Sequence, residues 1–127
     1  MRGEGNTGQW KERDVNAIVQ ALPVFFVAID AEGRTLVMNR AMLQALGYTL
    51  DEVVGKDYLS TFVPEAERRM LSEVFERLVK SRKPTFNRNH VLTRDGRELL
   101  VEWHGRPVFK PSGELDYFFG VGIDVTE

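Results

Sequence analysis

The sequence contains no cysteine, and this absence excludes several kinds of chemistry. Disulfides, thiolate metal sites, cysteine nucleophiles and cysteine-linked chromophores all require the missing side chain. A c-type haem is excluded for the same reason, because cysteines attach it to the chain. The composition suits a reducing compartment, and we expect a cytoplasmic protein.

Long apolar segments and a surplus of basic charge are also missing. The longest apolar run covers residues 21–29, which is too short to span a bilayer, and Pro23 interrupts it. The formal net charge is −2, whereas a nucleic-acid site needs a concentrated basic face. We therefore expect no membrane insertion and no nucleic-acid partner.

The residues that are present are typical of one globular domain. The chain has 127 residues, of which 43% are hydrophobic and 28% are charged, and domains commonly have ~100–200 residues. We predict a flexible lead-in at residues 1–9, an amphipathic helix at residues 10–22 and the domain itself at residues 23–127.

The apolar periodicity predicts two strands, then several helices, then three strands. The longest helix is marked by Pro64 at its start, acidic residues in its first turn and basic residues at its end. We expect strands at residues 24–30, 35–39, 85–93, 99–109 and 115–125, and helices at residues 10–22, 40–47, 50–54, 57–62 and 64–83.

The first and last strands are apolar on both faces. A strand of this kind is covered on both sides in a folded protein. The helices that follow the first two strands can cover one face. We expect the helix at residues 10–22, from the same chain or from a second copy, to cover the other face through Trp10, Ile18 and Leu22, and we expect a homodimer.

This order of elements, together with several short motifs, resembles the PAS domain, a sensory module. The resemblance covers about residues 22–127. The motifs that carry it are Leu22-Pro23, Ile29-Asp30, Val37-Met38-Asn39-Arg40-Ala41, Leu46-Gly47-Tyr48, Leu50-Asp51-Glu52-Val53-Val54-Gly55-Lys56, Thr93-Arg94-Asp95-Gly96-Arg97, Gly113-Glu114-Leu115 and Gly122-Ile123-Asp124-Val125-Thr126-Glu127.

The resemblance implies an α+β fold, with a five-stranded antiparallel sheet, helices packed on one face and the N-terminal helix on the other. It also implies a non-catalytic sensory or relay module from a larger bacterial signalling protein, such as a histidine kinase or a cyclic-dinucleotide enzyme. Asp124 and Thr126 resemble the Asp-x-Thr junction through which such modules pass a signal to an output domain of the same polypeptide.

The cofactors of known subfamilies are disfavoured by the residues at the matching positions. Alignment on the Asp95-Gly96 turn places the flavin-contacting amide positions at Val91, Val101 and Gly122, which lack the hydrogen-bonding groups that a flavin needs. The position of the haem-ligating histidine falls on Leu71. No cofactor is predicted, and a small metabolite is the ligand class that remains.

Two amides, Asn87 and Asn89, alternate along one strand in phase with Val91. On an otherwise apolar wall they would orient a polar ligand, and the alternative is that they bond backbone groups or water, or face solvent. The glycines of the last strand, Gly120 and Gly122, leave space either for a ligand or for the indole of Trp103, and a large ring more often fills such a cavity than contacts a ligand. The full set of candidate ligand-binding residues is Asn87, Asn89, Val91, Val101, Trp103, Met70, Val74 and Gly122.

The register at the Asp95-Gly96 turn stays open at this point. A two-residue turn pairs Val91 with Leu100, whereas a bulged turn places Val91 on the same face as Val101. The comparison with the PAS family favours the bulged turn.

The two histidines, His90 and His104, are accompanied by neither cysteine nor a spaced acidic cluster, so no metal site is predicted. His104 shares a strand face with Glu102, which predicts an ion pair on the outer sheet surface. Two alternatives to a ligand-binding sensor are a ligand-free dimerisation module and, more remotely, a small α+β enzyme. The enzyme is disfavoured because no nucleophile, base and metal cluster converge in the sequence.

Overall fold

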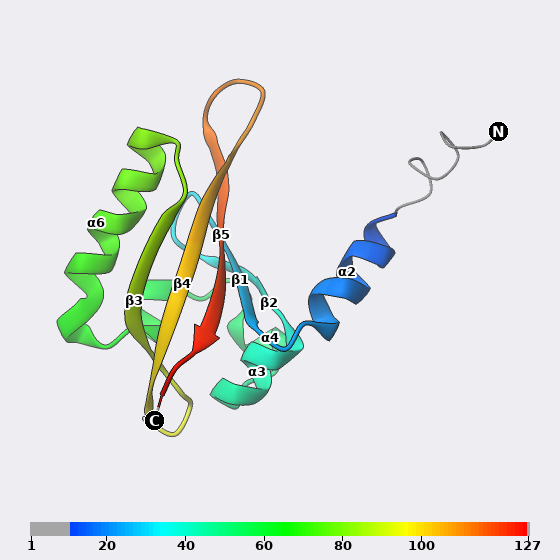
Figure 1. Ribbon diagram of the computed structural model, residues 1–127, viewed down its shortest axis with the longest axis vertical. Helices are drawn as coiled ribbons and strands as arrows, with labels where there is room; N and C mark the ends of the chain where they lie inside the picture. The colour runs from blue at the N-terminus through cyan, green and yellow to red at the C-terminus, as the bar shows by residue number, and fades with distance from the viewer. Residues whose placement is uncertain (1–10, 127) are drawn as a thin grey trace.

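A computed structural model of the chain describes residues 11–126 (Figure 1). Residues 1–9 and Trp10 of the predicted helix lie outside this range. The elements are α2 (Glu12–Ala21), β1 (Phe25–Asp30), β2 (Thr35–Met38), α3 (Arg40–Leu46), α4 (Leu50–Val53), α5 (Tyr58–Phe62), α6 (Glu65–Ser81), β3 (Thr85–Leu92), β4 (Glu98–Phe109) and β5 (Leu115–Asp124). None of the helices among the described residues is both long enough and apolar enough to cross a membrane.

The strands form one five-stranded antiparallel sheet in the order β2-β1-β5-β4-β3, which confirms the predicted fold. The first and last strands lie side by side at its centre, with Phe25 opposite Gly122 and Asp30 opposite Tyr117. Their inner-facing side chains Phe25, Val27, Ile29 and Phe118 belong to the core, whereas neighbouring strands cover only their edges and leave their outer faces to other cover. Figure 1 shows α6 lying along one side of the sheet, beside β3 and β4.

The core lies between the inner face of the sheet and the helices that follow β2. In α6 the side chains of Leu71, Val74 and Leu78 are buried, and their spacing by three and four residues places them on the helix face toward the sheet. Met70, predicted as a candidate ligand-binding residue, does not share this face. Its side chain is 38% exposed, because one residue before Leu71 is a rotation of about 100° around the helix.

The β3-β4 hairpin has the bulged register. Val91 lies opposite Leu99, and the Thr93 N–H donates to the Arg97 carbonyl at 2.9 Å, so three residues form the loop. Gly96 adopts φ +88°, the left-handed conformation that this type of hairpin loop requires. Val91 therefore lies on the inner face of the sheet together with Leu99 and Val101.

Helix α2 lies against the outer side of the sheet at one margin only. Val15 and Val19 line a groove opposite Phe26 and Val37, while the helix extends away from the rest of the sheet (Figure 1). None of its described residues is buried, and Ile18 is 48% exposed. The predicted cover of the outer face is therefore incomplete within one copy of the chain.

Asn39 holds the end of α2, the start of β1 and the start of α3 together. Its Oδ1 accepts from the Phe26 N–H at 3.0 Å and the Met42 N–H at 3.2 Å. Its Nδ2 donates to the Val19 carbonyl at 3.0 Å and the Val24 carbonyl at 2.9 Å. The side chain is fully buried, with a hydrogen-bond partner for both of its polar atoms.

Candidate functional site

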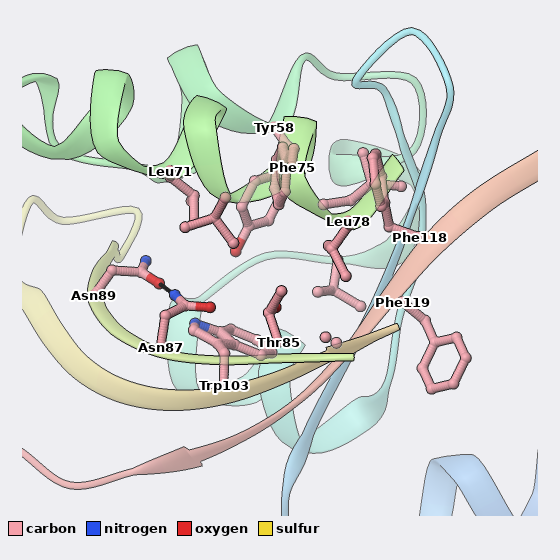
Figure 2. A pocket seen from close by; sticks show the side chains of 15 residues that line it. Tyr58, Leu71, Phe75, Leu78, Thr85, Asn87, Asn89, Trp103, Phe118 and Phe119 are labelled. Atoms are coloured by element: carbon pink, nitrogen blue, oxygen red, sulfur yellow. Dashed lines mark hydrogen bonds between the residues drawn. The ribbon is translucent and has the colours of Figure 1, made fainter. Parts of the chain in front are cut away.

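A small cavity lies between the inner face of the sheet and helices α5 and α6 (Figure 2). Its volume is about 40 Å³, which is space for about three water molecules, since each needs roughly 10–15 Å³. Aliphatic and aromatic side chains form most of the wall, and none of the lining residues is charged. The wall therefore offers a ligand apolar contacts and a few uncharged hydrogen-bonding groups.

The structure divides the candidate ligand-binding residues into two groups. Asn87, Asn89, Trp103 and Val74 line the cavity. The other four, Met70, Val91, Val101 and Gly122, are absent from its wall. Met70 is too exposed, as described above, and the remaining three are buried in the core beside the cavity rather than facing it.

The Trp103 indole covers the glycines of β5. Its ring lies on Gly120 and Gly122 of β5, where a Cβ at Gly120 would approach Cε3 of the indole to 3.0 Å. Phe25 packs beside it with the ring centroids 6.5 Å apart. The side chain is 6% exposed, so the space above the glycines is filled by the indole, as the sequence predicted.

The two amides form a short hydrogen-bonded chain along β3. Asn87 Nδ2 donates to Asn89 Oδ1 at 2.8 Å, and Asn89 Nδ2 donates to the His90 carbonyl at 3.0 Å. Asn89 is 2% exposed and Asn87 is half-buried. Both amides thus face the interior. The bond from Asn89 to the His90 carbonyl agrees with the alternative that these amides bond backbone groups, whereas the bond between the two amides was not predicted.

Two further polar residues of the cavity, Tyr58 and Thr85, were missed by the sequence analysis. Tyr58 of α5 is 3% exposed, and burial raises the pKa of its phenol well above the usual range. Thr85 of β3 has a buried hydroxyl with no hydrogen-bond partner among the described residues. The alternation Thr85, Asn87, Asn89 would have revealed the threonine, whereas nothing in the sequence places the tyrosine opposite β3.

Glu67 of α6 holds the exposed edge of β3. Its Oε1 accepts from the His90 N–H at 2.6 Å, and its Oε2 lies 2.6 Å from His90 Nδ1. The predicted ion pair between His104 and Glu102 is wrong. Glu102 pairs instead with Arg88, which lies opposite it on β3, and His104 packs against the Phe86 ring at 4.8 Å between centroids.

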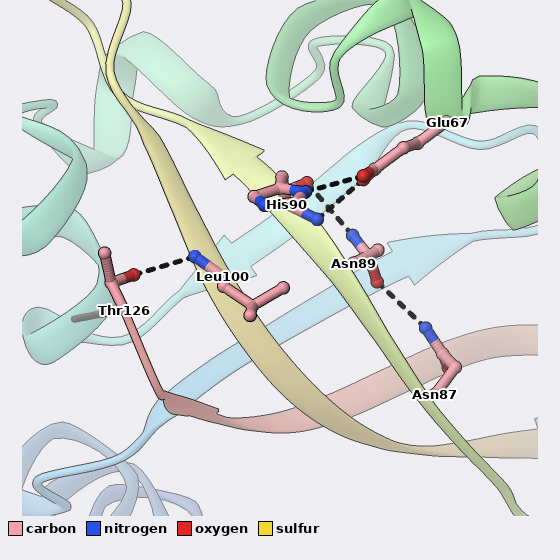
Figure 3. A network of polar contacts seen from close by, with 6 residues as sticks. All are labelled: Glu67, Asn87, Asn89, His90, Leu100 and Thr126. Carbon is pink, nitrogen blue, oxygen red and sulfur yellow. Dashed lines mark hydrogen bonds and ion pairs between the residues drawn. The ribbon is translucent and has the colours of Figure 1, made fainter.

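Val125 and Thr126 are hydrogen-bonded to β4. The Leu100 N–H donates to Thr126 Oγ1 at 2.7 Å, and the Val125 N–H donates to the Leu100 carbonyl at 2.8 Å. Asp124 Oδ1 accepts from the Thr126 N–H at 2.9 Å. Leu100 is the cross-strand partner of His90, so only one strand pair separates the amide chain from Thr126 (Figure 3).

A family model described as the PAS fold matches residues 13–125 of this chain. The virulence sensor protein BvgS of Bordetella parapertussis is 32% identical to this chain over 116 residues. The match covers 89% of this chain and 9% of that protein, so the chain spans a small part of its relative's length.

Solved structures share the fold. The PAS domain of a protein from Colwellia psychrerythraea superposes with a TM-score of 0.79 at 18% identity, covering 90% of this chain and 96% of that one. A domain of the sensory box sensor histidine kinase/response regulator from Geobacter sulfurreducens gives a TM-score of 0.71 at 26% identity, covering 88% of this chain and 92% of that one.

Proposed function

This chain belongs to the PAS family, and we propose that it is a non-catalytic sensory module of a larger cytoplasmic signalling protein, of the histidine kinase or cyclic-dinucleotide enzyme type. In this proposal a small metabolite binds in the cavity between the sheet and α6. The signal passes through the junction at Asp124 and Thr126 to an output domain of the same polypeptide. The sensor relatives named above support this assignment.

The proposed relay depends on one observation: a short series of hydrogen bonds and one strand pair connect the cavity with the junction at Asp124 and Thr126. Asn89 lines the cavity and donates to the His90 carbonyl. His90 lies opposite Leu100, whose N–H and carbonyl bond Thr126 and Val125. A ligand that bonds Asn87 changes the position of the amide that donates to Asn89, and this gives the ligand a differential interaction with two arrangements of the β3-β4 edge.

Glu67 makes the relay sensitive to α6 as well as to the sheet. Because its carboxylate bonds both the N–H and the ring of His90, any shift of α6 over a bound ligand is transmitted to the same point of β3. We propose that the ligand shifts the population of arrangements of this edge, and that the hydrogen bonds of Thr126 report the shift to the output domain.

Native mass spectrometry of the domain purified from cells, followed by a thermal-shift screen of the identified mass, tests ligand binding. A ligand at 100 times its dissociation constant adds about 2.7 kcal/mol to the free energy of unfolding. Binding with a change in the amide resonances of Leu100 and Thr126 supports the sensor. Binding that leaves these resonances unchanged contradicts the relay.

A ligand-free dimerisation module is the second candidate, and a specific observation favours it. The outer face of the sheet and α2 both expose large apolar side chains, including Ile18 at 48%, Phe86 at 61% and Ile123 at 48%. We propose that a second copy covers these surfaces in a homodimer, with Ile18 of α2 and Leu22, which follows the helix, at the contact. Dimerisation with no bound mass in the native spectrum would favour this candidate over the sensor.

A further inference from the structure

We infer that the cavity takes a small uncharged molecule that carries both a hydrogen-bond donor and an acceptor, held by the Tyr58 and Thr85 hydroxyls together with the Asn87 amide. This inference rests on the proposed sensory function, and it adds the chemical class of the ligand and two binding residues.

Polar side chains from opposite walls, Tyr58 on one side and Thr85 and Asn87 on the other, face one another across the cavity. Tyr58 comes from α5, and Figure 2 shows its hydroxyl directed across the cavity toward the β3 side chains. The Thr85 hydroxyl is buried, and it has no hydrogen-bond partner in the part of the chain that the structure describes. Buried polar groups in folded proteins nearly always have a hydrogen-bond partner, so the arrangement calls for one from outside the chain.

The Asn87 amide also has hydrogen-bonding groups that its bond to Asn89 leaves free. Asn87 spends one N–H on Asn89 Oδ1, which leaves its carbonyl oxygen and its second N–H for another partner. A phenol and a threonine hydroxyl can each donate and accept. The free groups thus include acceptors that need a donor and donors that need an acceptor, and a ligand with both satisfies them.

The side chains that line the cavity also carry no charge. The aliphatic face of α6, with Leu71, Val74 and Leu78, lies across from the indole of Trp103, and no lining residue is ionisable except the phenol of Tyr58. An ionised ligand would lose its hydration without gaining a counter-charge, and this is costly in an apolar environment. The volume of about 40 Å³ limits the ligand to a few heavy atoms.

Acetamide, acetone and acetate test the class because they have nearly the same shape and differ in hydrogen bonding and charge. We propose titration of each into the isotope-labelled full chain, with the side-chain resonances of Asn87 and Trp103 as the readout. We expect saturable shifts with acetamide, at least threefold weaker binding of acetone, and no saturable shift with acetate. Equal binding of acetate, or no saturable shift with acetamide, overturns the inference while leaving a sensor of another ligand class intact.

Two variants connect binding to the newly assigned residues. Tyr58→Phe removes only the hydroxyl, and we expect it to weaken acetamide binding at least threefold; Tyr117→Phe, which makes the same change on the outer face of the sheet, serves as the matched control. Thr85→Val is a second variant with nearly unchanged volume. Unchanged acetamide binding in both cavity variants overturns the assigned roles.

The resonances of Leu100 and Thr126 are followed in the same titrations. If acetamide binds in the cavity and these two amides do not respond, the proposed relay fails and the ligand class stands. If none of the probes binds, the ligand class fails, and the relay is then tested with the mass recovered from cells.

Discussion

The indole of Trp103 occupies the place that a side chain at Gly122 would need. A Cβ on Gly122 would lie 2.7 Å from both Cε3 and Cζ3 of the ring, and equally close to Cγ1 of Val101. The corresponding approach at Gly120 is 3.0 Å. The two glycines of β5 therefore determine how deeply the tryptophan sits, and with it where the cavity ends.

Gly122→Ala is predicted to destabilise the domain by about 2 kcal/mol, because overpacking a filled core forces side chains from their preferred positions. Gly120→Ala, where the contact is looser, is expected to cost less. Denaturant unfolding of both variants measures the difference. A Gly122→Ala variant as stable as the original chain would contradict the placement of the indole.

Asn39→Ala is predicted to lower the free energy of unfolding by about 3 kcal/mol or more, because buried N–H and carbonyl groups lose their partners. Four hydrogen bonds of the Asn39 side chain disappear together, including those that fasten the end of α2 and the start of β1. Asn16→Ala on the exposed side of α2 is the control, expected within about 0.5 kcal/mol of the original chain. Equal stability of the two variants would argue against the observed role.

Asp57 provides a pH-dependent contribution to stability. Hydrogen bonds from the Ser60 hydroxyl and N–H lower the pKa of its carboxyl below the usual 3.8. A lowered pKa in the folded state stabilises the protein above the unfolded value, and the contribution is lost as the pH falls through the folded pKa.

Asp57→Ala should therefore cost about 1 kcal/mol at neutral pH, the usual value for a helix N-cap. The difference from the original chain should shrink as the pH falls below about 4. Asp57→Asn keeps the cap without an ionisable group and is the control. A difference between the Ala variant and the original chain that stays constant down to pH ~2 would contradict the role of the charge.

Ile18→Asp is predicted to weaken self-association at least about tenfold, which corresponds to about 1.4 kcal/mol. A charge placed on the exposed apolar side of α2 would be buried against the second copy. Asn16→Asp adds the same charge to another face of α2, about 200° around the helix from Ile18, and is expected to leave association unchanged. Light scattering over a concentration series measures both variants, and removal of residues 1–22 should abolish the dimer if α2 provides its contact.

The apolar patterns of the strands predicted which side chains share a face, and they did not predict the register between strands. The two-sided apolar character of residues 24–30 and 115–125 predicted strands covered on both faces. The structure pairs them as β1 and β5 and covers their inner faces with the core, whereas α2 covers the outer side only in part. Alternation within β3 likewise placed Asn87 and Asn89 on one face. The register of the β3-β4 hairpin depends on a three-residue loop that ends at Gly96. The sequence was compatible with this loop and also with a two-residue turn.

Local periodicity and residue type were enough to predict the order of elements, the faces of the strands and the absence of thiol chemistry. Three features came from long-range packing instead. Tyr58 lies across the cavity from Thr85 and Asn87. The indole of Trp103 covers Gly122, and the side chain of Met70 points away from the cavity. These outcomes depend on how α5 and α6 dock on the sheet and how far each ring reaches, and such long-range packing leaves no periodic signal in the chain.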